Sequence, residues 1–112
     1  MYKPLRCPSY EDVACQETDK ALQEAIRGEA AAIKFYTYLI ELTPDQVQRD
    51  LIFGIREDEK RHLNNFQAVY CRLTGCTYSY PEPDVDQPHS YCQGLAKAFN
   101  DEQEAYEFYK AN

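Results

Sequence analysis

The sequence has no long uncharged apolar run, and its first six residues, Met1 to Arg6, lack the apolar core of a signal peptide. A membrane-spanning helix needs about 20 consecutive apolar residues, and a secretory signal needs a shorter apolar stretch. Positive charge is also scarce, with 12 Lys and Arg against 19 Asp and Glu and a net charge of −7. Nucleic acids and anionic membranes attract basic surfaces. We therefore expect a cytoplasmic protein that binds neither nucleic acid nor a membrane.

Cysteine pairs of the Cys-x-x-Cys type are absent as well, although the sequence contains five cysteines. Their spacing matches no zinc ribbon. In a reducing compartment we expect free thiols, and the alternative is a redox-sensitive pair of Cys71 and Cys76 near a helix end. With 44% hydrophobic residues among 112, the chain can form one domain with a modest core.

Between Thr43 and Leu73, apolar residues recur every three or four positions, as on the inward face of an amphipathic helix. The positions of this stripe are Leu51, Ile55, Glu59, His62, Phe66, Val69 and Leu73. Two of them, Glu59 and His62, are polar. A buried carboxylate or imidazole is costly unless it is paired. A divalent metal ion held by Glu-x-x-His in a helix bundle is a known form of pairing.

The same break occurs on two further stripes, each with one glutamate at an inward position. They comprise Leu22, Ile26, Glu29, Ile33, Tyr36 and Ile40, and Leu95, Phe99, Glu102, Tyr106 and Tyr109. Glu29 aligns with Glu102 at the same offset of 73 that aligns their neighbours, which indicates a duplicated helical hairpin. A lone inward glutamate is more often a paired core residue, and Glu-x-x-His also arises by chance on charged helices. Three such breaks together favour a metal site.

Local signals predict an irregular segment over residues 1–17 and an all-α domain over 18–112. The expected helices cover about 19–42, 44–74 and 90–112. Thr43, Pro44 and Gln46 are typical of an N-cap, a first-turn proline and a capping box. The joint before the second helix is therefore short, so the first two helices should form an antiparallel hairpin.

A long crossover should follow the second helix. Residues 76–89 contain Pro81, Pro83 and Pro88, which favour an extended chain. At about 3.3 Å per residue, 14 residues span roughly 46 Å, close to the length of the second helix. The crossover can therefore pass the whole hairpin and place the third helix parallel to the second.

This order of helices resembles the ferritin-like superfamily, and most closely its rubrerythrin-type domains. The resemblance covers about Ala21 to Asn112, and the segments Arg56 to His62 and Asp101 to Ala105 carry it. It implies a helical bundle that holds two iron ions, with manganese as an alternative. The metal ligands that it implies are Glu29, Glu59, His62 and Glu102. It also implies oxidation of ferrous iron by oxygen or peroxide, of the ferroxidase or peroxidase type, with an external electron donor and no catalytic residue beyond the ligands.

The sequence departs from this family at its fourth helix. The offset of 73 places a second Glu-x-x-His at positions 132 and 135, beyond residue 112, and the cysteine pairs of a rubredoxin domain are also missing. We expect a homodimer or higher homo-oligomer that completes the bundle. Two alternatives remain open: a non-catalytic truncated ferritin-like module for interaction or scaffolding, and a shortened form of a longer enzyme.

Overall fold

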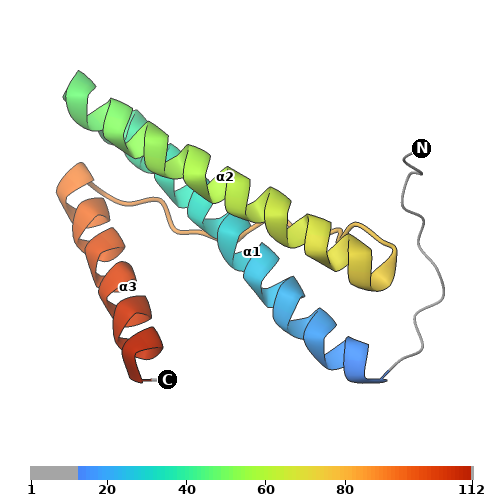
Figure 1. Ribbon diagram of the computed structural model, residues 1–112. Helices are drawn as coiled ribbons and strands as arrows, with labels where there is room; N and C mark the ends of the chain where they lie inside the picture. Colours follow the sequence, from blue (N-terminus) through green and yellow to red (C-terminus); the bar gives the residue numbers. More distant parts are fainter. Residues whose placement is uncertain (1–12, 112) are drawn as a thin grey trace.

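The computed structural model describes residues 13–111, apart from the side chains at 13–18, 105, 106, 108, 109 and 111. It contains three helices, α1 (Val13–Leu42), α2 (Gln46–Thr74) and α3 (Tyr91–Ala111) (Figure 1). No strand occurs among these residues, so the expected all-α fold is confirmed. α1 begins six residues before the expected start at 19, within the segment expected to be irregular. The side chains of Tyr106 and Tyr109 lie outside the described residues.

Two side chains within the joint between α1 and α2, those of Thr43 and Asp45, bond to the backbone. Asp45 is the N-cap of α2, and its Oδ2 accepts a hydrogen bond from the backbone N–H of Gln48 at 3.1 Å. The expected cap, Thr43, belongs instead to the end of α1, because its hydroxyl donates to the carbonyl of Leu39 at 2.6 Å. Threonine hydroxyls commonly bond to the preceding helical turn in this way. The helix boundary therefore falls two residues later than expected.

The core lies between α1 and α2, which pack against each other as an antiparallel hairpin (Figure 1). Its buried cluster consists of Phe35, Tyr36, Leu39 and Ile52. Val85 of the crossover and Ala98 of α3 pack against this cluster from outside. The hairpin thus carries the core, and the remaining segments cover one end of it.

The face of α2 that packs on α1 is displaced by one residue from the expected inward stripe. The buried residues of α2 are Ile52, Tyr70 and Thr74. The stripe residues Leu51, Ile55, Val69 and Leu73 are 65%, 42%, 46% and 41% exposed, respectively. One residue corresponds to a rotation of about 100°. The expectation that this whole stripe is inward is therefore wrong for these four apolar residues, which face an open side of the hairpin.

The crossover, residues 75–90, returns along the hairpin as expected (Figure 1). It begins at Gly75, whose φ of 82° is left-handed and whose N–H donates to the carbonyl of Cys71 at 2.7 Å. The Gln67 side chain then pairs with the backbone of Tyr78 through two hydrogen bonds of 2.9 Å. Farther on, Lys34 of α1 donates to the carbonyl of Pro83 at 2.7 Å. These bonds explain why a proline-rich segment follows a defined path.

The expectation of free thiols is confirmed for two of the described cysteines and is wrong for the third. Cys76 is disulfide-bonded, whereas Cys71 and Cys92 are free. The alternative pairing of Cys71 with Cys76 is therefore also wrong.

α3 begins at the end of the hairpin where α2 begins and runs in broadly the same direction, as expected, but it diverges from the hairpin (Figure 1). Within the described residues, its backbone approaches α1 and not α2. The contact depends on Gly94, where a Cβ atom would collide with Cδ2 of Leu39. α3 is thus attached mainly through its first turns. None of the described helices combines the length and apolar composition that a membrane span requires.

Candidate metal centre

Three of the four expected ligands meet on the α1–α2 hairpin. Glu29 of α1 and Glu59 and His62 of α2 each offer a ligand atom, and these atoms lie within 4.8 Å of one another. Nδ1 of His62 is 3.8 Å from Oε2 of Glu29 and 3.8 Å from Oε2 of Glu59. The sequence expectation that these residues form one group is confirmed.

Helix geometry explains why residues from distant parts of the chain come together. Glu29 precedes the joint at Thr43 by 14 residues, and Glu59 follows it by 16. At about 1.5 Å per residue, these positions are roughly 21 and 24 Å from the joint, so antiparallel packing puts them level. Glu59 and His62 share one face of α2 because residues three apart are neighbours on a helix.

The two carboxylates are shielded from water, whereas the imidazole is not. The side chains of Glu29 and Glu59 are each 18% exposed, and that of His62 is 51% exposed. Oε2 of Glu29 is buried and has no hydrogen-bond partner. A buried polar atom without a partner is costly, so this oxygen is suited to bind a proton or a cation.

Burial, together with the proximity of Glu59 and the charge of Glu102, raises the pKa of Glu29 from 4.5 to about 8. Two ionised carboxylates are both acceptors and cannot bond to each other. A protonated Glu29 can donate a hydrogen bond to Glu59, and this bond favours the protonated form and so raises the pKa of Glu29. At neutral pH a proton therefore occupies the place that a metal ion could take.

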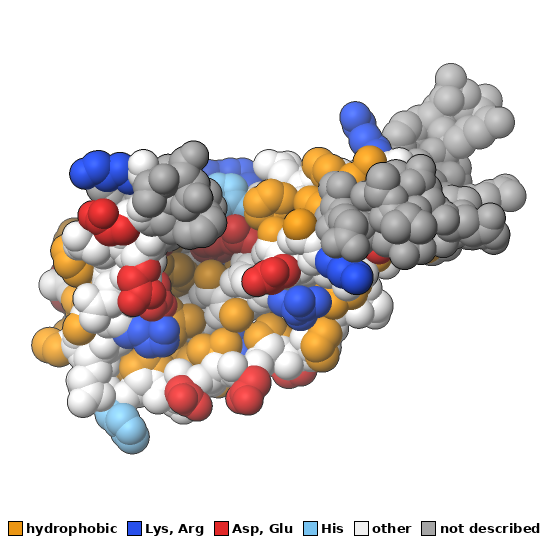
Figure 2. Space-filling view, turned by 90° about the horizontal axis from the view of Figure 1, so that it is seen from below, with side chains coloured by type: hydrophobic (Ala, Val, Ile, Leu, Met, Phe, Trp, Pro, Cys, Tyr) orange, Lys and Arg blue, Asp and Glu red, His pale blue; other side chains and the backbone are white. Residues whose placement is uncertain are grey.

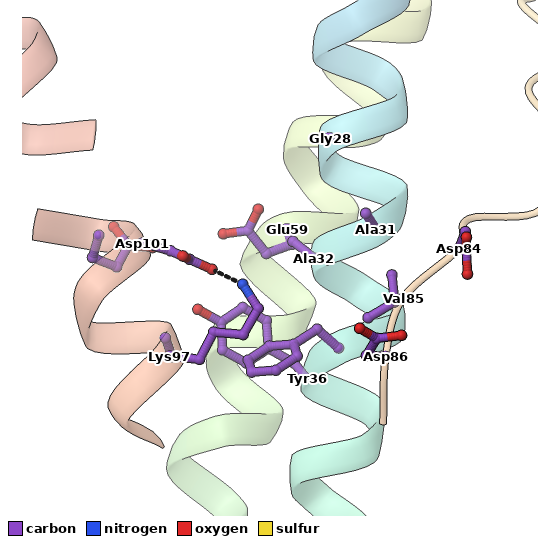
Figure 3. Close-up of a pocket in the computed structure, with 13 residues that line it drawn as sticks. Gly28, Ala31, Ala32, Tyr36, Glu59, Asp84, Val85, Asp86, Lys97 and Asp101 are labelled. Carbon is purple, nitrogen blue, oxygen red and sulfur yellow. Dashed lines mark hydrogen bonds and ion pairs between the residues drawn. The ribbon is translucent and has the colours of Figure 1, made fainter. Parts of the chain in front are cut away.

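An open cavity of about 440 Å³ lies beside the group, between the hairpin, the crossover and α3. Figure 3 shows Glu59 of α2, Tyr36 of α1, and Lys97 and Asp101 of α3 around it, with Asp84 to Asp86 of the crossover on another side. Burial, together with the charges of Glu102, Glu59 and Asp101, raises the pKa of Tyr36 to about 12. The phenol therefore stays protonated at neutral pH.

The fourth expected ligand, Glu102, stands apart from the group. It is exposed on α3 and lines the same cavity as Glu59. Its charge still contributes to the raised pKa of Glu29. The structure therefore places Glu102 near the centre but not among the three converging side chains.

Other charged residues at this cavity were not singled out from the sequence. Asp84 and Asp86 come from the crossover, and Lys97, which binds Asp101 at 2.8 Å, comes from α3. Their positions depend on how the crossover folds against α1, and no periodic pattern encodes that path. The proline content of the crossover predicted its extension but not its register.

Comparison with known proteins places the chain in a family. No family model matches the sequence, and no solved structure matches it. The chain is 39% identical over 108 residues to the uncharacterized protein YhjR of Bacillus subtilis (strain 168), a match that covers 96% of this chain and 72% of YhjR. The chain belongs to the YhjR family.

In this YhjR-family chain, the group offers two carboxylates and one imidazole, with no thiolate. Such oxygen and nitrogen donors suit iron, manganese and related divalent ions. The unpaired Oε2 of Glu29 is consistent with a cation between the two helices. The residues present therefore fit a metal ion.

Proposed function

We propose that this YhjR-family protein is a ferritin-like protein that binds iron, or manganese, at Glu29, Glu59 and His62. The observation that carries the proposal is the convergence of three ligand atoms within 4.8 Å, from two helices, around a buried and unpaired carboxylate oxygen. Exposed acidic groups cluster without any ion in many proteins. Here both carboxyl groups are mostly buried, and two adjacent carboxyl groups shielded from water need a proton or a cation between them.

Oxidation of ferrous iron by oxygen or peroxide is the reaction class that this donor set supports. With hydrogen peroxide, the oxidant takes one electron from each of two ferrous ions, which are substrate, and two protons, and leaves as two water molecules. The cavity of about 440 Å³ is ample for so small an oxidant, since water fills about 30 Å³ per molecule. An external donor would be needed to return the ferric product to the ferrous state.

The residues of the chain have separate parts in this scheme. Glu29 would give up its proton when a cation binds, and Glu59 and His62 would supply the other two ligand atoms. Tyr36 keeps its proton and closes the inner wall of the cavity. Glu102 adds negative charge that draws cations into the cavity, and it would become a ligand only if α3 moved toward the hairpin.

A non-catalytic role in protein interaction is the second candidate. The observation that favours it is the number of exposed large apolar side chains, four of which form one stripe on α2. Clusters of exposed apolar residues commonly mark interaction surfaces. Figure 2 shows hydrophobic side chains gathered along a hollowed face of the molecule, with acidic side chains among them.

An anaerobic oxidation experiment separates the two candidates. Metal-free protein is loaded with ferrous iron, hydrogen peroxide is added, and the ultraviolet absorption of ferric carboxylate is followed. We expect oxidation at least ten times faster than in buffer, and loss of this acceleration in Glu59→Gln and His62→Ala. The matched control is His89→Ala, because His89 is exposed and lies outside the group. Equal rates in all variants and in buffer would contradict the catalytic proposal and leave the interaction role.

A further inference from the structure

Four exposed apolar residues of the α2 stripe are placed symmetrically about His62. Leu51 and Leu73 each lie 11 residues from His62, and Ile55 and Val69 each lie seven residues from it. At 100° per residue, all four fall within about 20° of the direction of His62 around the helix. The four exposed apolar residues therefore lie at matching distances on either side of a candidate ligand.

This symmetry is what a two-fold axis requires. In an interface between identical copies, a residue that contacts a second residue is matched by the reverse contact on the other side. An axis through His62, perpendicular to α2, would set Ile55 against Val69 of the other copy and Leu51 against Leu73. Each of these four exposed apolar residues would then meet an apolar residue of the other copy. The exposed fractions of 41% to 65% show that this contact surface is available.

The metal group lies at the centre of the same surface. The two-fold axis would pass through the half-exposed imidazole of His62, and Glu59 is about one helical turn away from it. One chain supplies two carboxylates and one imidazole. Two chains supply four carboxylates and two imidazoles, whose formal charge of about −4 two divalent ions would balance. The group in a single chain is thus half of a balanced centre.

We infer that two copies of this chain associate through the Leu51–Leu73 stripe of α2 and jointly hold two metal ions, each copy contributing Glu29, Glu59 and His62. This inference rests on the proposed function, because without a metal ion the facing carboxylates repel each other. Glu102, exposed on α3, is not a ligand of this shared centre.

Metal controls the association, because the apolar contact alone is small. The stripe covers 22 residue steps, about 33 Å, and a helix face is about 10 Å wide, which gives roughly 330 Å² per copy. A stable interface usually buries about 800 Å² per partner. The metal-free protein should therefore be monomeric at micromolar concentration, and bound metal should shift it to a dimer.

Sedimentation equilibrium of the full 112-residue chain, with and without manganous ion, tests this inference. We expect a mass of 13.1 kDa without metal and twice that with metal. Ile55→Glu and Val69→Glu should each hold the metal-loaded protein at the monomer mass, since each puts a carboxylate into the centre of the stripe. Phe53→Glu is the matched control: Phe53 is 48% exposed, close to the 46% of Val69, but it is half a turn away from the stripe on α2.

Manganese binding is measured on the same samples by equilibrium dialysis, so that two kinds of failure are distinguished. If the wild type binds manganese, Glu59→Gln does not, and the metal-loaded wild type stays at 13.1 kDa, the shared centre would be overturned and the proposed function would remain. Absence of binding would overturn the proposed function, and the shared centre with it. A mass that doubles equally in Phe53→Glu and Val69→Glu would show that another surface mediates association and would also overturn the inference.

Discussion

His62 Nδ1 lies 3.8 Å from Glu29 Oε2, although the two residues are 33 positions apart and belong to different helices. This separation is too long for a hydrogen bond. Two ligands about 2.1 Å from one ion lie about 3.0–3.4 Å apart at octahedral or tetrahedral angles, so a small closing movement would suit a shared cation. The relationship follows from the antiparallel packing of α1 and α2.

Metal binding should release a proton near neutral pH. The pKa of Glu29 is raised to about 8, mainly by burial, so this carboxyl is largely protonated at pH 7. A cation that binds its oxygen displaces that proton. Calorimetric titration with manganous ion, repeated in buffers of different ionisation enthalpy, should report about one proton released per Glu29 occupied.

The proton release on metal binding should depend on pH and on Glu29. Near pH 9 the carboxyl is already ionised, so the number of protons released should fall toward zero. Glu29→Gln removes both the titrating group and one ligand, and it should abolish the release together with tight binding. Proton release that stays constant from pH 6 to 9 would show that another group is titrating.

The metal-free protein should lose stability as pH rises, and Glu29→Gln should remove part of that loss. The folded pKa of about 8 is above the ordinary value of 4.5. The contribution of the neutral Glu29 carboxyl to the stability of the folded state is therefore fully present below pH 4.5 and is lost as the pH rises toward 8. In urea unfolding, the free energy of unfolding of Glu29→Gln should rise relative to that of the wild type by about 1 kcal/mol per pH unit between pH 4.5 and 8. Glu24→Gln, at an exposed position of the same helix, should show no such trend.

The attachment of α3 should depend on the absence of a side chain at residue 94. A Cβ on Gly94 would collide with Leu39 Cδ2 and lie 3.3 Å from Pro88. Gly94→Ala should therefore destabilise the protein by about 1–3 kcal/mol, as overpacking does. Gly54→Ala is the control, because no atom lies within 4 Å of its added Cβ, and it should stabilise α2 by about 0.5–1 kcal/mol. Equal effects of the two substitutions in thermal unfolding would contradict the close contact of α3 with α1.

Periodicity was sufficient to predict the helices and the hairpin. Glu29, Glu59 and His62 could be grouped from sequence because each interrupts an apolar stripe and each lies at a similar distance from Thr43. A helical stripe, however, gives only the direction of the apolar face and not the neighbour that covers it. On α2 the stripe and the α1 contact differ by one residue, since Ile52 and Tyr70 are buried in place of Leu51 and Val69.

Features that depend on tertiary contacts could not be predicted. Thr43 and Asp45 both have capping side chains, and the bond of Thr43 to Leu39 decides that Asp45 caps α2. The position of Glu102 depends on the angle of α3, which the Gly94 contact and the crossover determine. Cysteine spacing alone could not show that Cys76 forms a disulfide.

Anomalous diffraction from crystals grown with manganous ion tests most directly whether Glu29, Glu59 and His62 bind a metal ion together. We predict strong anomalous density enclosed by the two carboxylates and the imidazole, with ligand distances of about 2.0–2.3 Å. Crystals of His89→Ala should show the same density, and crystals of Glu59→Gln should lack it. Manganese found only at other acidic residues, or absent between α1 and α2 at millimolar concentration, would contradict the account.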